Sequence, residues 1–254
     1  MGPAVEFNKL LPPATRFVEG DPRTLYWVRD GKVSFRHYPL QRAEAATFGF
    51  YLGCFAVDAK RCYCTNSRLT KADPTSFQCL NYTFYKDRNH VWTMFGEVKK
   101  ADATTFTVAD IGVVEEYGTW HAFGFGKDRN GVYYVGLYGY MGWLPDVDPD
   151  SFVSCGDGHL GYDIAHVYCG NKKLSKARPG SWAKIGGAYS RDGDRVYCLN
   201  HLVKGADPDS FWVPPQPGTQ GRAARDKARF YLSGVSVEAS EFEAQVRQHA
   251  EPPS

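Results

Sequence analysis

The sequence lacks a long apolar run and a surplus of charge of either sign. Its first 22 residues contain Glu6, Lys9, Arg16 and Glu19 and no long apolar core, so neither a signal peptide nor a membrane-spanning helix is expected. Lys and Arg number 30 against 28 Asp and Glu, and this balance argues against a nucleic-acid binder driven by phosphate neutralisation. We therefore expect a cytoplasmic protein whose partner is neither nucleic acid nor a membrane.

The motifs of the common catalytic and cofactor sites are also missing. The chain contains no G-x-S-x-G, no H-E-x-x-H, no P-loop and no dinucleotide fingerprint. Asp146, Asp148 and Asp150 alternate like the first ligands of a calcium loop, but the Gly and the distant Glu of such a loop are absent. We therefore predict no enzymatic activity, no cofactor and no metal site.

The cysteines show neither metal-ligand nor redox spacing. There are seven, an odd number, and no two of them form a C-x-x-C pair. Cys64, Cys169 and Cys198 each follow a Tyr in a β-type run, where a small buried apolar residue fits. We expect reduced core thiols, and a disulfide between Cys62 or Cys64 and a neighbour is the alternative.

Aromatic residues, in contrast, are abundant, and they recur at a fixed spacing. They make up 15% of the chain. A turn aspartate precedes a closing aromatic residue seven times, and in five of these units the two are 18 or 19 residues apart. The seven pairs are Asp30 and Phe48, Asp58 and Phe77, Asp87 and Phe106, Asp128 and Phe152, Asp163 and Trp182, Asp192 and Phe211, and Asp226 and Phe242. Such a period indicates a repeat architecture.

Each unit predicts a β-hairpin followed by one turn of helix. Lys127–Tyr134 reads KDRNGVYY, and Asp with Asn or Gly between aromatic β-runs favours a hairpin turn because these residues tolerate positive φ. Ala206–Phe211 reads ADPDSF, in which the Asp caps backbone N–H groups and the Pro suits a first helical position. The Phe would fill the core beneath the hairpin. One unit cannot bury its apolar face alone, so neighbouring units must stack.

The predicted fold class is therefore all-β with short one-turn helices, in a tandem array of about seven β-hairpin repeats. Residues 1–25 form a lead-in, residues 26–242 the array and residues 243–254 a helical tail, with the helix expected over residues 241–250. Successive closing aromatics are mostly 29 to 31 residues apart, which is short for a propeller blade. We therefore favour an open, solenoid-like array over propeller-like closure.

These repeated segments resemble a known family. KDRNHVW at Lys86–Trp92, KDRNGVYY at Lys127–Tyr134, and the two ADP-x-SF segments that end at Phe77 and Phe211 are similar to the DKNYY family of bacterial repeat proteins. The resemblance extends over roughly residues 26–242. It implies β-hairpin repeats and no known catalytic residue. Some members look like envelope lipoproteins and others like partners of secreted toxins, so a toxin-neutralising role is implied by analogy.

The repeat spacing is longer around the fourth unit, where Phe106 and Phe152 are 46 residues apart. Two insertions there contain aromatic residues interleaved with glycine. Tyr and Trp dominate the energetic hot spots of protein interfaces, and acidic neighbours attract a basic partner. The predicted partner-binding residues are Tyr117, Trp120, Tyr138, Tyr140, Trp143, Glu115 and Glu116. The alternative is that the aromatic residues only extend the sheet and the core.

We accordingly expect a non-enzymatic protein-binding module. Its most specific form is an immunity protein that neutralises a bacterial toxin by binding and occluding it. The first alternative is a structural or cell-envelope repeat protein that binds carbohydrate or another surface ligand. The second is an enzyme that uses Asp110, Glu115 or His121, although no nucleophile–base arrangement is readable.

Overall fold

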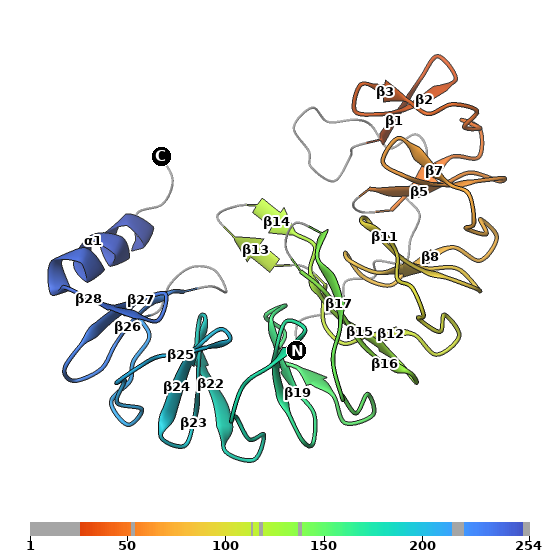
Figure 1. Ribbon diagram of the computed structural model, residues 1–254. Coiled ribbons are helices and arrows are strands. Elements are labelled where there is room, and N and C mark those ends of the chain that lie inside the picture. Colours follow the sequence, from red (N-terminus) through yellow and green to blue (C-terminus); the bar gives the residue numbers. More distant parts are fainter. Residues whose placement is uncertain are drawn as a thin grey trace. The chain divides into compact units, whose positions relative to one another are not determined.

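The computed structural model describes residues 26–51, 54–112, 114–116, 119–136, 139–214 and 221–250, and this part of the chain is almost entirely β (Figure 1). Its strands form seven antiparallel sheets of three or four strands and one two-stranded hairpin. The number of sheets agrees with the seven units predicted from the sequence. The chain divides into two compact units, the first within residues 1–112 and 126–130 and the second within residues 113–125 and 131–254.

The first unit contains a three-stranded and two four-stranded sheets, each a simple meander. Their strands are β1 (Tyr26–Arg29), β2 (Lys32–Phe35) and β3 (Tyr38–Pro39); β4 (Gly49–Phe50), β5 (Phe55–Val57), β6 (Cys62–Cys64) and β7 (Ser67–Leu69); and β8 (Gln78–Cys79), β9 (Tyr85–Lys86), β10 (Val91–Thr93) and β11 (Gly96–Glu97).

The next sheet is interrupted by an inserted hairpin. The sheet consists of β12 (Thr107–Val108), β15 (Gly124–Asp128), β16 (Gly131–Val135) and β17 (Met141–Trp143). Between its first two strands the chain forms the separate hairpin of β13 (Val114–Glu116) and β14 (Thr119–His121).

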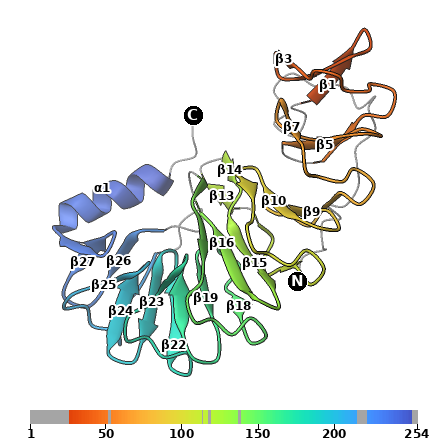
Figure 2. The same ribbon diagram turned by 45° about the vertical axis from the view of Figure 1, so that its right-hand side comes forward.

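The rest of the second unit continues the meanders and ends in a helix. Its strands are β18 (Val153–Ser154), β19 (Leu160–Tyr162), β20 (Val167–Cys169) and β21 (Lys172–Lys173); β22 (Trp182–Gly186), β23 (Tyr189–Asp192), β24 (Arg195–Cys198) and β25 (His201–Leu202); and β26 (Ala223–Arg225), β27 (Phe230–Leu232) and β28 (Val235–Val237). Helix α1 (Ala239–Ala250) confirms the predicted tail helix and lies against β26–β28 (Figure 2), where the Phe242 and Phe230 ring centroids are 5.0 Å apart. No helix in the described part of the chain combines the length and the apolar character needed to cross a membrane.

The predicted hairpin forms the middle of each four-stranded sheet. Val91 lies opposite Lys86, for example, and β8 and β11 extend the pair on both sides. The prediction of one-turn helices is wrong at the Asp-Pro segments, which form turns, and α1 is the one α-helix among the described residues. The Asp-Pro segment instead closes one turn, from the Ser76 N–H to the Asp73 carbonyl at 3.3 Å, and extended backbone resumes at Gln78. The Asp side chain still caps this turn as expected, since Asp73 Oδ1 accepts the Thr75 N–H at 3.1 Å.

Six of the turn aspartates are buried. Each accepts a hydrogen bond from the linker, the segment that precedes the first strand of its sheet. Asp163 Oδ1 accepts the N–H groups of Ala165 and His166 at 2.8 and 2.6 Å. Its Oδ2 accepts the linker N–H of Asp148 at 2.9 Å and the Tyr168 hydroxyl at 3.2 Å. A linker N–H meets the buried carboxylate in the same way in the pairs Glu44–Asp58, Asp73–Asp87, Asp102–Asp128, Arg178–Asp192 and Asp207–Asp226. These bonds compensate the cost of burying a charge.

The closing aromatics pack between successive sheets. The Phe77 ring lies 5.9 Å from Phe55 in the preceding sheet and 6.2 Å from Tyr85 in the following one. Phe211 bridges Tyr189 and Tyr231 in the same way, at 5.3 and 5.5 Å. All six closing Phe side chains are buried, as predicted, and Trp182 is half-buried. Phe77 and Phe211 therefore supply contacts through which neighbouring sheets stack.

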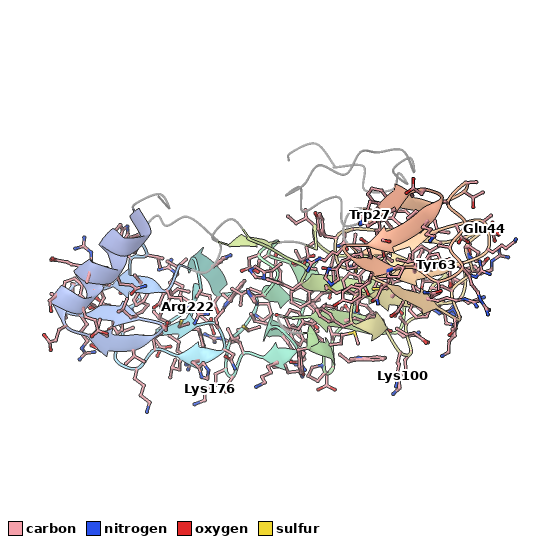
Figure 3. All side chains as sticks on the ribbon, turned by 90° about the horizontal axis from the view of Figure 1, so that it is seen from above. Trp27, Glu44, Tyr63, Lys100, Lys176 and Arg222 are labelled. Atoms are coloured by element: carbon pink, nitrogen blue, oxygen red, sulfur yellow. The ribbon has the colours of Figure 1, made fainter. Side chains whose placement is uncertain are left out.

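Four of the cysteines are buried and three are half-buried, and all seven are free thiols. Cys64, Cys169 and Cys198 each end the third strand of a four-stranded sheet, which confirms their predicted common repeat position. Burial raises the pKa of Cys62 to about 12, so this thiol stays protonated at neutral pH. Cys54 and Cys64 come closest, with 3.4 Å between their sulfur atoms. Neighbouring Tyr63, labelled in Figure 3, donates its hydroxyl to Asp58 at 2.6 Å.

Candidate functional site

Exposed aromatic side chains gather on β17, the last strand of its sheet. Tyr140 precedes the strand and is 51% exposed, and Trp143 within it is 41% exposed. Met141, between them in sequence, is also exposed. The strand pairs with β16, with Trp143 opposite Tyr133. The structure therefore brings together two of the predicted binding residues and adds Met141, which the sequence analysis did not select.

Contacts within the second unit hold these exposed residues in place. The Trp143 and Tyr133 ring centroids lie 5.2 Å apart at an interplanar angle of 60°. The indole also covers Gly131, where an added Cβ would come within 3.0 Å of it. The Asn171 side-chain amide donates a hydrogen bond to the Tyr140 hydroxyl at 2.5 Å. An aromatic side chain held in this way loses little conformational entropy when a partner binds.

The first insertion forms an antiparallel hairpin. In its register Glu115 lies opposite Trp120 and Glu116 opposite Thr119. The structure describes the backbone at Glu115, Glu116 and Trp120, and their side chains lie outside what it describes. Tyr117 and Tyr138 are outside the described residues altogether. The predicted binding role of these five residues therefore stays a prediction.

A polar cluster that sequence reasoning missed includes Tyr134 of β16 and lies in the second unit. The Tyr134 hydroxyl is 3.1 Å from His159 Nδ1, and the Phe123 ring is 4.8 Å from the His159 ring. Burial lowers the pKa of His159, although nearby Asp157 acts in the opposite direction. Lys184 Nζ lies 2.6 Å from Asp157 Oδ2. The sequence does contain a signal for this cluster when the repeats are aligned on their turn aspartates. Asp157 stands at the position of Asn81, and Lys184 stands at the position of Cys79.

Three of the acidic residues singled out for chemistry have structural partners. Asp110 Oδ1 accepts the N–H of Gly112 at 2.9 Å, as a turn residue does. Asp146 pairs with Lys173 at 2.8 Å, and the hydrogen bond from this Lys lowers the pKa of Asp146. Asp148 accepts the Ser151 hydroxyl at 2.5 Å, in line with the expected capping role. Within the described ranges, no three His, Cys, Asp or Glu side chains are grouped so as to hold a metal ion.

These features define a β-repeat protein built from small antiparallel sheets, each fastened by a turn carboxylate. The model of the DKNYY family matches residues 55–201 and, in a second overlapping register, residues 96–234. The chain belongs to the DKNYY family. A match in two registers is what a tandem repeat produces, because the same pattern recurs further along the chain. No curated protein and no solved structure matches the chain.

Proposed function

We propose that this protein is a non-enzymatic protein-binding module whose partner docks on β17. The observation that carries the proposal is the exposed pair Tyr140 and Trp143, supported from below by Tyr133 and Gly131. Large aromatic side chains in a preformed arrangement are the usual energetic centre of a protein interface. Met141 adds a flexible apolar side chain that adapts to the surface it contacts.

The most specific form of the proposal is a bacterial immunity protein that acts in the cytoplasm. It neutralises a toxin by covering the toxin's active site, and neither a cofactor nor chemistry of its own is involved. Occlusion requires a binding surface that stays in one conformation. The hydrogen bonds between the linkers and the buried turn aspartates support such a surface. The same proposal includes an open, solenoid-like array of the seven sheets, which small-angle X-ray scattering of the whole chain tests against a closed ring.

Affinity capture from the protein's own cells tests the binding role. The bait proteins are the wild-type chain, the double variant Tyr140→Ala/Trp143→Ala and the matched control Leu202→Ala. Leu202 is similarly exposed and also lies on the last strand of a four-stranded sheet. Equal melting temperatures of the three proteins establish that all are folded.

We expect one stoichiometric protein partner with the wild type and with the control, and loss of that partner with the double variant. Equal capture by all three proteins removes β17 from the interface. If no protein is captured and a glycan array gives a signal that depends on Tyr140 and Trp143, the carbohydrate-binding alternative replaces the proposal.

A further inference from the structure

Most repeats carry an ion pair at one fixed position. An acidic side chain on the linker that enters a sheet pairs with a cation in the turn that follows the buried aspartate. The pairs are Glu44–Lys60 at 2.5 Å, Asp73–Arg88 at 2.6 Å, Asp102–Arg129 at 2.7 Å and Asp207–Lys227 at 3.0 Å. Three of the four cations come directly after the turn aspartate.

The sheet β18–β21 departs from this rule. Its linker acid is Asp148, and the residue directly after its turn aspartate is Ile164, which is 79% exposed. No cation forms an ion pair with Asp148 among the residues that the structure describes. The Ile164 N–H donates to the Ser151 hydroxyl at 3.2 Å, as the Arg88 N–H does to Ser76. The backbone of the turn is therefore unchanged, and only the side chain has become apolar.

A second position in the same sheet has lost its cation. In three other sheets the second strand carries Lys or Arg opposite the first strand, in the pairs Lys86–Gln78, Lys127–Thr107 and Arg191–Ala183. In the last sheet Arg225, which also precedes the turn aspartate, lies opposite Trp212 in an isolated bridge. In the sheet β18–β21 Tyr162 occupies this position, and it lies opposite the exposed Val153. The Tyr162 ring packs against Trp182, with 5.9 Å between the centroids.

We call Ile164 and Asp148 the isoleucine face, because the Ser151 hydroxyl accepts the Ile164 N–H and donates to Asp148. Single exposed apolar residues are common, but Ile164 stands where three other sheets carry the cation of an ion pair, and its linker acid Asp148 is retained.

We propose that the isoleucine face binds a partner-protein segment that carries an Arg or Lys beside a large apolar side chain. The partner's cation pairs with Asp148, in the place that Arg88 and Arg129 fill within their own sheets. The apolar side chain covers Ile164. Exposed Asp150 adds a second negative charge that complements the same cation.

Arginine suits this face better than lysine. Its aliphatic chain packs on an apolar surface, and its planar guanidinium group forms a bidentate ion pair with a carboxylate. The inference rests on the proposed protein-binding function and adds a second contact in the unit that holds β17.

Phage display of random peptides against the immobilised full chain tests the inference. We expect the enriched peptides to share an Arg or Lys next to Leu, Ile or Phe. The consensus peptide is then synthesised, and its binding is measured by fluorescence anisotropy. Ile164→Arg, which restores the sister repeats' own ion pair, and Asp148→Asn should each weaken this binding at least tenfold.

Two control variants separate this inference from the function proposed above. Val235→Arg places the same side chain on an exposed apolar position of another sheet and should bind the peptide normally. Tyr140→Ala/Trp143→Ala should also bind it normally, even though it loses the captured partner. Enrichment without a basic–apolar consensus, or undiminished binding by Ile164→Arg, overturns the isoleucine face and leaves the β17 interface standing.

Discussion

Asp157 and Lys184 form an ion pair that joins two neighbouring sheets, with 2.6 Å between Oδ2 and Nζ. Asp157 is buried, and the Lys184 side chain is 28% exposed. The other carboxylate oxygen of Asp157 accepts the N–H groups of His159 and Leu160 at 2.9 and 2.8 Å. Asn81 makes the same two bonds with its amide oxygen in the sheet β8–β11. The turn around Asp157 therefore has the same hydrogen bonds as the neutral turn around Asn81, and the ion pair with Lys184 is added to them.

This comparison gives a prediction for a double-mutant cycle. Lys184→Met leaves the Asp157 carboxylate buried without its cation, so we expect a loss of about 2–3 kcal/mol in the free energy of unfolding, below the usual cost because Lys184 is partly exposed. Asp157→Asn/Lys184→Met recreates the neutral turn and should lie within about 1 kcal/mol of the wild type. Urea denaturation measures both values. A double variant as unstable as the sum of the single variants contradicts the account.

The buried turn aspartates should dominate the stability of each sheet. Asp163→Ala removes the acceptor of three backbone N–H groups and one hydroxyl and leaves the donors buried. We expect a loss of about 3 kcal/mol or more in the free energy of unfolding. The control Asp209→Ala, an exposed linker residue, should change it by less than about 0.5 kcal/mol. Similar losses for the two variants would show that the buried carboxylate has no special role.

The same carboxylates make stability depend on pH. Burial raises the pKa of Asp58, Asp163 and Asp226, but hydrogen bonds to their oxygens outweigh burial, and each pKa is lowered overall. A lowered folded-state pKa gives stability that is complete above the unfolded value of about 3.9 and is lost as the pH falls through the folded value. We therefore expect the free energy of unfolding to fall steeply below about pH 4. Urea titrations in acid buffers measure this, and a flat profile there contradicts it.

A left-handed backbone position recurs two residues before the linker residue whose N–H bonds to the buried turn aspartate. Its φ is 69° at Lys100, 64° at Lys176 and 72° at Gly205, and Figure 3 shows both lysine side chains extending away from the ribbon. Lys176→Gly removes the steric cost of positive φ, offset in part by glycine's greater freedom in the unfolded chain, so we expect a gain of up to about 1 kcal/mol. Lys172→Gly, in strand β21, should instead be destabilising. Thermal unfolding of the two variants decides the sign of each effect.

The sequence was sufficient to predict the parts of the fold that repeat at a regular spacing. The turn aspartates and closing aromatics predicted the number of sheets, the central hairpins and the burial of residues such as Phe106. The outer strands were missed because segments such as Gly96–Glu97 are two residues long and have no alternation to read. The burial of the turn aspartates was missed because an Asp in a hairpin turn is ordinarily exposed, and their linker bonds reach 14 or more residues along the chain.

The candidate site was predictable only in part. Composition identified Tyr140 and Trp143, and their exposure depends on the strand pairing of β17, which the sequence did not reveal. The isoleucine face depends on the ion pairs of the sister repeats, such as Asp73–Arg88 and Asp102–Arg129, and these pairs were not read from the sequence. An exposed Ile is uninformative by itself, and Ile164 indicates a binding site because the sister repeats carry a cation at its position.

The most direct measurement of the central claim is hydrogen–deuterium exchange on the free chain and on the chain with its captured partner. We expect slower exchange in the complex over residues 139–144, together with unchanged exchange in the matching segment around Leu202 on β25. Protection confined to other sheets, with residues 139–144 exchanging as in the free chain, would contradict a partner interface on β17.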